Sequence, residues 1–354
     1  MKPINTKLNR LLKRYDYQLP QDLIAQKPAS PRDAARLLIY GKRSKQSRFD
    51  VFKNLARYLP ENAVLVFNQT KVWPARLILA KPTGGKIQIL YLGHNKNSLQ
   101  ILANKKMPVG AAYSLLRGRV KVSTLEIIKK QGKIYHLKPA FPISRLPAML
   151  KACGLTPLPP YIKHTSLSER EKRREYQSIF AKTGLSVAAP TASLHFTKTL
   201  MAKLRQKGIA LKFVQLDVNL GTFAPLREQN LKTGLLHEEF YSIDKATAAF
   251  LNRAKAQGRP MIAVGTTVAR TLEAAAKNQR LARLQAKTKL FIQEGYSFQF
   301  LDGLITNFHV PKSSLLMLVS ALAGRKQILN LYQQAIKKDF RFFSFGDGML
   351  ILPN

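Results

Sequence analysis

The sequence predicts an α/β protein in which a larger α/β domain carries an inserted small β-barrel domain. Its 354 residues exceed what one ordinary core fills, so two domains are expected. Short β-type runs follow one another closely between about residues 74 and 145. After this region, strand-like and helix-like segments alternate, which is typical of α/β folds. We therefore assign 1–73 and 146–354 to a discontinuous α/β domain and 74–145 to the barrel.

The first part of the chain supplies the elements of this division in order. The run "AVLVFN" (63–68) predicts a strand, and the runs after residue 74 are separated by turn signals such as "PTGG", "GHNKN" and "KKQGK". The segment "PLPPYI" (157–162) must be extended, because each proline fixes its own φ and restricts its predecessor. It predicts a strap that returns the chain to the first domain. A charged stretch follows and predicts a solvated helix that enters a core at Tyr176 and Phe180.

The second part alternates between predicted helices and strands. Glycines close two of the helices, and Gly258 stands where a C-terminal cap is expected. The predicted helices are 197–208, 245–258, 268–278 and 312–324. The predicted strands are 209–216, 260–264, 287–292, 300–308 and a terminal strand that ends at 352.

Charge is the most unusual property of the composition. The chain has 59 Lys and Arg against 19 Asp and Glu, a formal net charge of +40. Such a chain attracts polyanions through counterion release, so nucleic acid is the first partner class to consider and an anionic membrane surface the second. Compositional drift toward lysine is an alternative without a functional cause. The basic residues are dispersed, so the charge predicts a partner class and not a site.

Cysteine content and apolar run length bear on localisation. The single cysteine, Cys153, excludes a disulfide within the chain and a cysteine-based metal cluster, and it suits a reducing cytoplasm. The apolar run 313–324 is shorter than the roughly 18 residues of a membrane span. The N-terminal segment has no apolar core of signal-peptide length. We therefore expect a cytoplasmic protein without a membrane association.

Four segments share a pattern that predicts a ligand pocket. In each, an apolar run ends in small and hydroxyl-bearing residues before a helix begins, and ligands of α/β folds bind at the carboxyl ends of strands. Several such ends on one sheet would form a polar pocket. The segments are "VAAPTASLHFT" (187–197), "DVNLGTFAPL" (217–226), "IAVGTTVART" (262–271) and "LITNFHVPKSS" (304–314).

One of these segments predicts an anion site. Thr266 or Thr267 can cap the following helix, whose first N–H groups favour a carboxylate or phosphate. Arg270 lies one turn further and could hold the same anion by a forked contact. An ordinary capped helix with a surface arginine is the alternative. Neither a Walker loop nor the glycine fingerprint of dinucleotide-binding folds occurs.

Histidines and one aspartate are the other candidates for chemistry. His195, His237 and His309 each end an apolar stretch, and His237 precedes Glu238 and Glu239. A histidine beside carboxylates suits a proton relay or half of a metal site, but no metal-binding spacing of histidines occurs. Asp347 lies between two glycines, as a turn residue or as an acceptor at the mouth of a cleft. For each of these residues a structural role stays open.

Together these segments resemble the S-adenosylmethionine:tRNA ribosyltransferase-isomerases of queuosine biosynthesis (the QueA family). The resemblance runs in order from about residue 15 to the C-terminus. It is carried by "YDYQLPQDLIAQKP" (15–28), "VLVFNQTKVWPARL" (64–77), "KPTGGKIQIL" (81–90), "PLPPYI", "YQSIFAKTGLSVAAPTASLHFT" (176–197), "LGTFAPL" (220–226), "HEEFY" (237–241), "AVGTTVARTLE" (263–273), "GLITNFHVPKSSLLMLVSALAG" (303–324) and "RFFSFGDGMLI" (341–351).

The resemblance implies an activity. The family transfers the ribosyl part of S-adenosylmethionine to 7-aminomethyl-7-deazaguanine at the wobble position of a tRNA, giving epoxyqueuosine, adenine and methionine. S-adenosylmethionine is then a consumed co-substrate, and no other cofactor and no metal is expected. The sulfonium acidifies the adjacent ribose methylene, so a general base is needed, and a general acid helps adenine to leave. We expect a monomer whose partners are S-adenosylmethionine and tRNA.

The matched motifs assign candidate residues to this chemistry. The catalytic candidates are His195, His237, Glu239 and His309. The candidates for substrate binding are Thr191, Thr222, Gly265, Thr266, Thr267, Arg270, Thr306, Asn307 and Asp347. The candidates for contacts with tRNA are Arg76, Lys81, Lys86 and Lys163.

The chain departs from the family pattern at several positions. Asp217 replaces an expected His, and Asn219 and Ser193 each replace a Gly. Gly234 stands where the family often has a second His. Exchange of His for Asp inverts the charge and changes the options for proton transfer, and a Cβ at position 193 would be strained if the backbone there needs a positive φ.

Two alternative functions follow from these observations. A catalytically impaired tRNA-binding relative would keep the fold and the basic surface, and the substitutions at Asp217 and Asn219 motivate it. A nonspecific nucleic-acid coat follows from charge alone, and it predicts equal affinity for tRNA and duplex DNA with a steep salt dependence for both.

Overall fold

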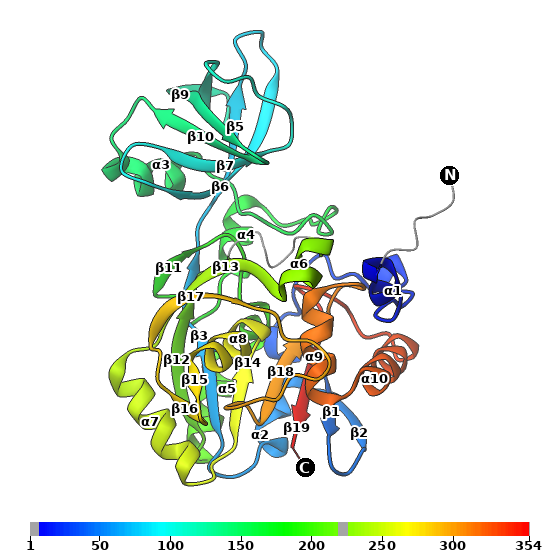
Figure 1. Cartoon of the computed structure of the whole chain (residues 1–354). Helices are drawn as coiled ribbons and strands as arrows, with labels where there is room; N and C mark the ends of the chain where they lie inside the picture. Colours follow the sequence, from blue (N-terminus) through cyan, green and yellow to red (C-terminus); the bar gives the residue numbers. More distant parts are fainter. Residues whose placement is uncertain (1–6, 219–225, 354) are drawn as a thin grey trace.

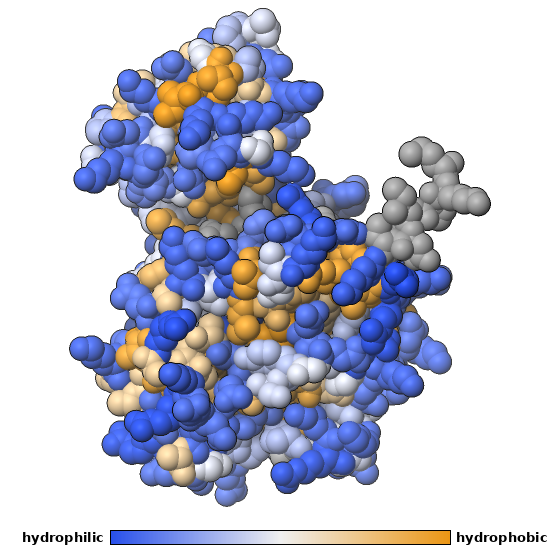
Figure 2. Space-filling model, viewed as in Figure 1, coloured by the Kyte–Doolittle hydropathy of each residue, from blue (hydrophilic) through white to orange (hydrophobic). Residues whose placement is uncertain are grey.

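The computed structural model describes residues 7–218 and 226–353 and has two parts, a sheet domain and a β-barrel joined to it by a narrow connection (Figure 1). This is the predicted α/β fold with an inserted barrel. On the face drawn in Figure 2, hydrophilic residues cover most of both parts, and apolar residues show at the waist between them. Among the described residues, no helix combines the length and the apolarity needed to cross a membrane.

A nine-stranded sheet organises the larger part. The strand order is β17-β13-β12-β3-β14-β18-β19-β1-β2, and the four central strands β12, β3, β14 and β18 run parallel. The strands are β1 (Arg36–Gly41), β2 (Ser47–Val51), β3 (Val64–Asn68), β12 (Ala210–Leu216), β13 (Leu235–Ser242), β14 (Met261–Val264), β17 (Gln285–Leu290), β18 (Gly303–Asn307) and β19 (Gly348–Leu352).

Helices cover both faces of this sheet, as the alternation of side chains along β3 shows. Val64 and Val66 face one core, and Leu65 and Phe67 face the other. Because both faces are covered, β3 is apolar without interruption and wholly buried. The first core is covered by α7 (Lys245–Ala256), α8 (Thr266–Ala275), α9 (Ser314–Ala323) and α10 (Arg325–Lys337). The second is covered by α2 (Leu55–Tyr58), α5 (Lys198–Gln206) and the 3₁₀ segment η5 (Thr191–His195).

Shorter elements complete the sheet domain. The helices are α1 (Lys7–Lys13), α4 (Glu169–Glu175) and α6 (Glu228–Thr233), and the 3₁₀ turns are η1 (Gln21–Leu23), η2 (Arg32–Ala34) and η3 (Phe52–Asn54). The small sheets pair β4 (Thr70–Val72) with β11 (Thr183–Ser186) and β15 (Ala276–Lys277) with β16 (Arg280–Leu281).

The inserted part is a closed barrel of six antiparallel strands, in the order β10-β7-β6-β5-β8-β9. The predicted series of short strands is thereby confirmed, and "PTGG" forms the hairpin turn between β5 and β6, with Gly84 at φ 88°. The strands are β5 (Arg76–Ala80), β6 (Lys86–His94), β7 (Leu99–Ala103), β8 (Ala112–Arg117), β9 (Val120–Gln131) and β10 (Ile134–Pro139). The turn η4 (Ile143–Arg145) leads into α3 (Leu146–Cys153), which packs on the barrel core.

The chain enters and leaves the barrel along two segments that lie together. Arg76 and Leu155 exchange both of their backbone hydrogen bonds, at 3.1 and 2.7 Å. Gly154 lies against this pair, and a Cβ at this position would overlap the carbonyl oxygen of Pro74. The connection therefore consists of two paired segments, and glycine at position 154 lets them approach closely. We call it the two-stranded link.

The charged helix forms as expected, whereas the strap is not extended throughout, because the N–H of Ile162 donates to the carbonyl of Pro159 at 3.0 Å and closes a turn. Residues 157–162 form neither helix nor strand, and α4 begins with a capping box in which the Ser168 hydroxyl accepts from the N–H of Glu171. Tyr176 and Phe180, which follow α4, are buried as predicted.

Candidate active site

A narrow pocket lies where the central parallel strands end. Seven of the predicted binding or catalytic residues line it, although they come from three separate parts of the chain. They are Thr191, Gly265, Thr266, Thr267, Thr306, Asn307 and His309. Its volume is about 50 Å³, and because one water needs about 10–15 Å³, the pocket holds a group of only a few heavy atoms. We call it the sheet-edge pocket. Thr222 lies outside the described residues.

The four segments expected at strand ends differ in structure. Those at 217–226, 262–271 and 304–314 follow β12, β14 and β18, as predicted. The segment at 187–197 follows no strand of the large sheet. It forms η5 instead, which packs beside β18 and brings Thr191 to the same pocket. A strand does precede this segment, but it is β11, which pairs with β4 in a small sheet, so the prediction of a strand end in the same sheet was wrong there.

The start of α8 differs from the expected cap. Gly265, at φ 97°, is the N-cap residue, and no side chain caps the helix. Thr266 and Thr267 are already the first two helical residues, so the prediction that one of them is the cap was wrong. Glycine adopts this φ without the steric cost that other residues carry. The first N–H groups of α8 have no partner within the helix, and they lie beside the sheet-edge pocket.

Asn68, at the end of β3, fixes this edge of the sheet. Its Nδ2 donates to the carbonyl of Leu216 at 2.9 Å and lies 3.5 Å from Thr267 Oγ1. Its Oδ1 accepts from the N–H groups of Thr70 and Leu216 at 3.0 and 3.2 Å. The sequence signal for this role was the one polar side chain at the end of an apolar run, and Asn68 was not among the predicted residues.

His195 supports the pocket from behind rather than lining it. Its Nε2 accepts from Asn307 Nδ2 at 3.1 Å, and its ring lies 4.7 Å from the ring of Phe52. Burial lowers the pKa of His195 to about 3, and the charges of Arg341 and Arg32 act in the same direction. The imidazole is therefore neutral at pH 7. It orients Asn307, whose own Oδ1 is buried and has no hydrogen-bond partner among residues 7–218 and 226–353.

His309 reaches the pocket directly. Its Nε2 lies 3.2 Å from Thr306 Oγ1, and its Nδ1 lies 3.5 Å from the hydroxyl of Tyr332. Its backbone N–H donates to the same hydroxyl at 2.9 Å. Burial lowers the pKa of His309 to about 3, so this ring is also neutral at pH 7.

The two buried histidines predict a pH dependence of stability. Each binds its proton in the unfolded chain near pH 6.5 but in the folded protein only near pH 3. The stabilisation is therefore complete above about pH 6.5 and is lost as the pH falls toward 3, by about 1.4 kcal/mol per pH unit for each histidine. Urea denaturation at about pH 7 and pH 5 would measure it. We expect His195→Gln to show a shallower decrease than the wild type, and equal decreases would contradict the assignment.

Arg270 and Glu239 form a buried ion pair. Arg270 Nη1 binds Glu239 Oε2, and the two side chains are only 5% and 1% exposed. Neither residue lines the sheet-edge pocket. The charge of Arg270 thus already has a carboxylate partner, supplied by β13, and its role as the holder of a substrate anion stays a prediction. His237, on the same strand as Glu239, is exposed, whereas Glu239 is buried.

Comparison with known proteins decides the family. Residues 12–351 match the family described as "Queuosine biosynthesis protein". The chain belongs to this family. Among its relatives, the S-adenosylmethionine:tRNA ribosyltransferase-isomerase of Carboxydothermus hydrogenoformans is 44% identical over 96% of this chain and 99% of its own length. The protein of that name from Staphylococcus haemolyticus is 40% identical over the same shares.

A solved structure supports the same assignment for the fold. The crystal structure of S-adenosylmethionine tRNA ribosyltransferase from Thermotoga maritima matches with a TM-score of 0.55 and 31% identity. The match covers 96% of this chain and 100% of that chain. Membership of the queuosine biosynthesis protein family, expected from the motifs, is thereby confirmed.

The departures from the family pattern have local structural explanations. Ser193 lies in η5 without a positive φ, so the strain considered for its Cβ is not present. Gly234 ends α6 at φ 66°, which favours glycine. Asp217 Oδ1 accepts from Thr70 Oγ1 at 2.9 Å and from Gln215 Nε2 at 3.1 Å. Asn219 lies outside the described residues.

Asp347 has a structural role in this family member. Its carboxylate accepts from the backbone N–H groups of Arg36 at 2.9 Å and of Arg341 at 2.7 Å. It is 1% exposed, and it joins the start of β1 to the loop before β19. The prediction of an acceptor at the mouth of the cleft is corrected, because both carboxylate oxygens are engaged by backbone N–H groups.

The predicted tRNA contacts separate into two groups. Arg76 is half-buried in the connection to the barrel, where its Nη2 donates to the carbonyl of Leu158 at 2.6 Å. This bond gives Arg76 a structural role, and its contact with tRNA stays a prediction. Lys81 and Lys86 flank the β5–β6 turn, and Lys163 is exposed directly after the strap. Lys81 and Lys86 are thus on the barrel, whereas the sheet-edge pocket lies in the sheet domain.

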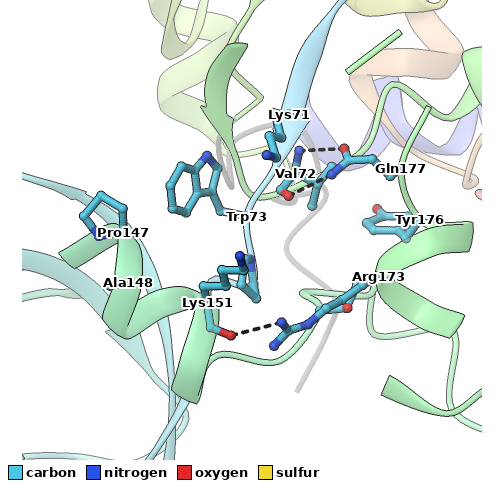
Figure 3. Close-up of a pocket in the computed structure, with 11 residues that line it drawn as sticks. Lys71, Val72, Trp73, Pro147, Ala148, Lys151, Arg173, Tyr176 and Gln177 are labelled. Carbon is cyan, nitrogen blue, oxygen red and sulfur yellow. Dashed lines mark hydrogen bonds between the residues drawn. The ribbon is translucent and has the colours of Figure 1, made fainter. Parts of the chain in front are cut away.

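A second and larger pocket, of about 410 Å³, lies between the barrel and the sheet domain. We call it the junction pocket. As Figure 3 shows, Pro147, Ala148 and Lys151 line it from α3, and Arg173, Tyr176 and Gln177 line it from α4 and the residues after it. The connecting segment with Lys71 and Trp73 forms a further wall. None of the catalytic, substrate-binding or tRNA-binding residues predicted from the sequence lines it.

Proposed function

We propose that this chain is an S-adenosylmethionine:tRNA ribosyltransferase-isomerase. It transfers the ribosyl part of S-adenosylmethionine to 7-aminomethyl-7-deazaguanine in tRNA and releases adenine and methionine. The observation that carries the proposal is the near full-length similarity, at 44% identity, to a relative of that name. The sheet-edge pocket supports it, because the residues of the matched motifs converge there.

The electrostatics of the sheet-edge pocket suit S-adenosylmethionine. At neutral pH this co-substrate carries a sulfonium, an ammonium and a carboxylate, and its net charge is positive. The described lining contains no Asp, Glu, Lys or Arg, and His309 is neutral. The N–H groups at the start of α8 can donate hydrogen bonds to the carboxylate. The Oδ1 of Asn307, which has no partner among the described residues, can accept a hydrogen bond from the ammonium. In this proposal the amino-acid end of the co-substrate occupies the pocket.

His309 is our candidate for the proton acceptor in the proposed reaction. Among the catalytic candidates in the described part of the chain, it alone lines the pocket. With a pKa of about 3 it is a weak base in the free protein. A bound carboxylate raises the pKa of a nearby imidazole, so binding of the co-substrate would strengthen this base.

The amine of the modified base would then attack the opened sugar. This chemistry requires no metal and no cofactor beyond the consumed co-substrate. The alternative of a catalytically impaired tRNA-binding relative rests on Asp217 and Asn219. The hydrogen bonds of Asp217 support a positioning role that leaves the sheet-edge pocket intact.

Release of adenine tests the proposed function. We expect the purified protein to release labelled adenine from S-adenosylmethionine only when the added tRNA carries 7-aminomethyl-7-deazaguanine. The matched control is the same tRNA with guanine at the wobble position. Binding of the modified tRNA without adenine release above background would favour the impaired relative. Equal affinity for tRNA and duplex DNA would favour the nonspecific coat.

A further inference from the structure

The junction pocket differs from the sheet-edge pocket in size and in charge. Its volume is about 410 Å³, against about 50 Å³, and its lining includes Lys71, Lys151 and Arg173. It also contains aromatic and proline side chains. A large pocket that is cationic and aromatic suits a planar group attached to an anion.

Trp73 presents a fixed aromatic surface in this pocket. It is the single tryptophan of the chain and is half-buried. Its Nε1 donates to the carbonyl of Gly184 at 2.9 Å, which holds the indole in one orientation. The same side chain lines the junction pocket and a neighbouring pocket toward Tyr91 and His94. An indole held at its edge in this way leaves ring surface free for stacking.

Two of the three cationic side chains are available to a ligand. Arg173 is engaged: it pairs with Glu169 at 3.3 Å and donates to the carbonyl of Lys151 at 3.0 Å, a bond drawn in Figure 3. Lys71 and Lys151 are exposed residues. Within the described chain, their ammonium groups form no hydrogen bond or ion pair. Arg173 thus holds α3 against α4, and the two lysines can neutralise an anion.

We propose that the junction pocket binds an unpaired nucleotide of the tRNA, with its base stacked on Trp73 and its phosphate near Lys71 and Lys151. The inference rests on the proposed function, and it names where the RNA substrate is held. Stacking of a base on an aromatic side chain contributes about 1–3 kcal/mol, and lysines bind the backbone through counterion release. The adenosine of S-adenosylmethionine is the other source of a purine. The net positive charge of S-adenosylmethionine is repelled by Lys71 and Lys151, whereas the phosphodiester of an RNA is attracted to them.

The single tryptophan allows a direct test. We expect an anticodon stem-loop RNA to quench the fluorescence of Trp73 in a saturable way, and S-adenosylmethionine alone to leave it unchanged. Trp73→Leu should raise the KM for tRNA by about 5–150-fold, which corresponds to about 1–3 kcal/mol. The kcat at saturating tRNA and the KM for S-adenosylmethionine should stay at their wild-type values. Trp73→Phe should restore most of the affinity, since phenylalanine retains an aromatic face.

The lysines have a separate measurement. Lys71→Ala and Lys151→Ala should each lower the slope of log affinity against log salt by about 0.7–0.9. Lys245→Ala, on α7 far from the junction, is the matched control and should leave the slope unchanged.

Opposite outcomes would overturn the proposal. Quenching by S-adenosylmethionine alone would assign the pocket to the co-substrate. An unchanged fluorescence with RNA, together with a wild-type KM for tRNA in Trp73→Leu, would remove the nucleotide from this pocket. Adenine release by the wild type is measured in the same samples. If release persists while these effects are absent, the pocket proposal fails and the proposed function stands. If release is absent, the function fails, and the fluorescence titration still decides the pocket.

Discussion

Replacement of Glu239 by Leu is expected to lower the free energy of unfolding by about 3–5 kcal/mol. The change leaves the guanidinium of Arg270 charged and 5% exposed without its carboxylate, and loss of one partner from a buried pair has a cost of this size. Two of its nitrogens, Nε and Nη2, already lack hydrogen-bond partners in the part of the chain that the structure describes, so the remaining contacts compensate little. Urea denaturation followed by circular dichroism gives the value.

The neighbouring residue on the same strand provides the control. Glu238 pairs with Lys287 at 2.8 Å, but both side chains are well exposed, at 40% and 68%. Glu238→Leu should therefore change the stability by less than about 1 kcal/mol. The double variant Glu239→Leu/Arg270→Met should recover part of the loss, because it removes the unpaired charge. If Glu239→Leu and Glu238→Leu lower the free energy of unfolding equally, the buried pair contributes no more to stability than the exposed one.

Replacement of Asn307 by Leu is expected to lower kcat/KM for S-adenosylmethionine by about 10–100-fold, which corresponds to about 1.4–2.7 kcal/mol. The variant keeps the side-chain volume but removes the Oδ1 that has no partner within the described protein. It also removes the 3.1 Å hydrogen bond that holds His195. Initial rates of adenine release at varied co-substrate concentration measure the effect.

Asn252→Leu is the matched control for this variant. Asn252 on α7 also makes two hydrogen bonds, with the N–H and the carbonyl of Leu281, and it lines a different pocket. We expect it to lower stability while kcat/KM stays unchanged. If both variants lose activity in proportion to their stability, Asn307 has a structural role only.

The sequence predicts the parts of the fold that local pattern determines. Turn residues between short alternating runs predict the barrel strands, and Gly208 and Gly258 end their helices at positive φ as expected. The hairpin of β1 and β2 was not predicted, since β2 is an edge strand whose residues are only partly buried. Helix α10 was not predicted either, although Ile328, Leu331 and Ala335 have helical spacing.

Strand order is a different matter, because pairing joins segments that are distant in the chain. Strand β19 lies between β18 and β1 and so places the C-terminal strand beside one that begins at Arg36. Side-chain pattern carries no information about this neighbour relation. It does predict that several strands end in polar residues, and this was sufficient to locate the sheet-edge pocket.

Site residues were hard to predict where a buried charge has a partner from a distant segment, because the sequence pattern does not reveal that partner. Arg270 has the spacing of an anion-binding residue one turn into a helix, yet Glu239 on β13 takes its charge. Asp347 has the surroundings of a cleft residue, yet two backbone N–H groups occupy its oxygens. The junction pocket was missed for a related reason. Its walls come from the barrel side and the sheet side, and each segment alone shows only ordinary lysines, prolines and a tryptophan.

The two-stranded link at Gly154 determines how the two parts of the molecule face each other. The absence of a side chain lets residue 154 lie against the carbonyl oxygen of Pro74, so any larger residue would wedge the entering and leaving segments apart. Because the barrel extends away from the link, a small rotation at the link would displace the far end of the barrel by a larger distance. The position of Lys81 and Lys86, which we predict to contact tRNA, therefore depends on a residue that lies outside the barrel strands.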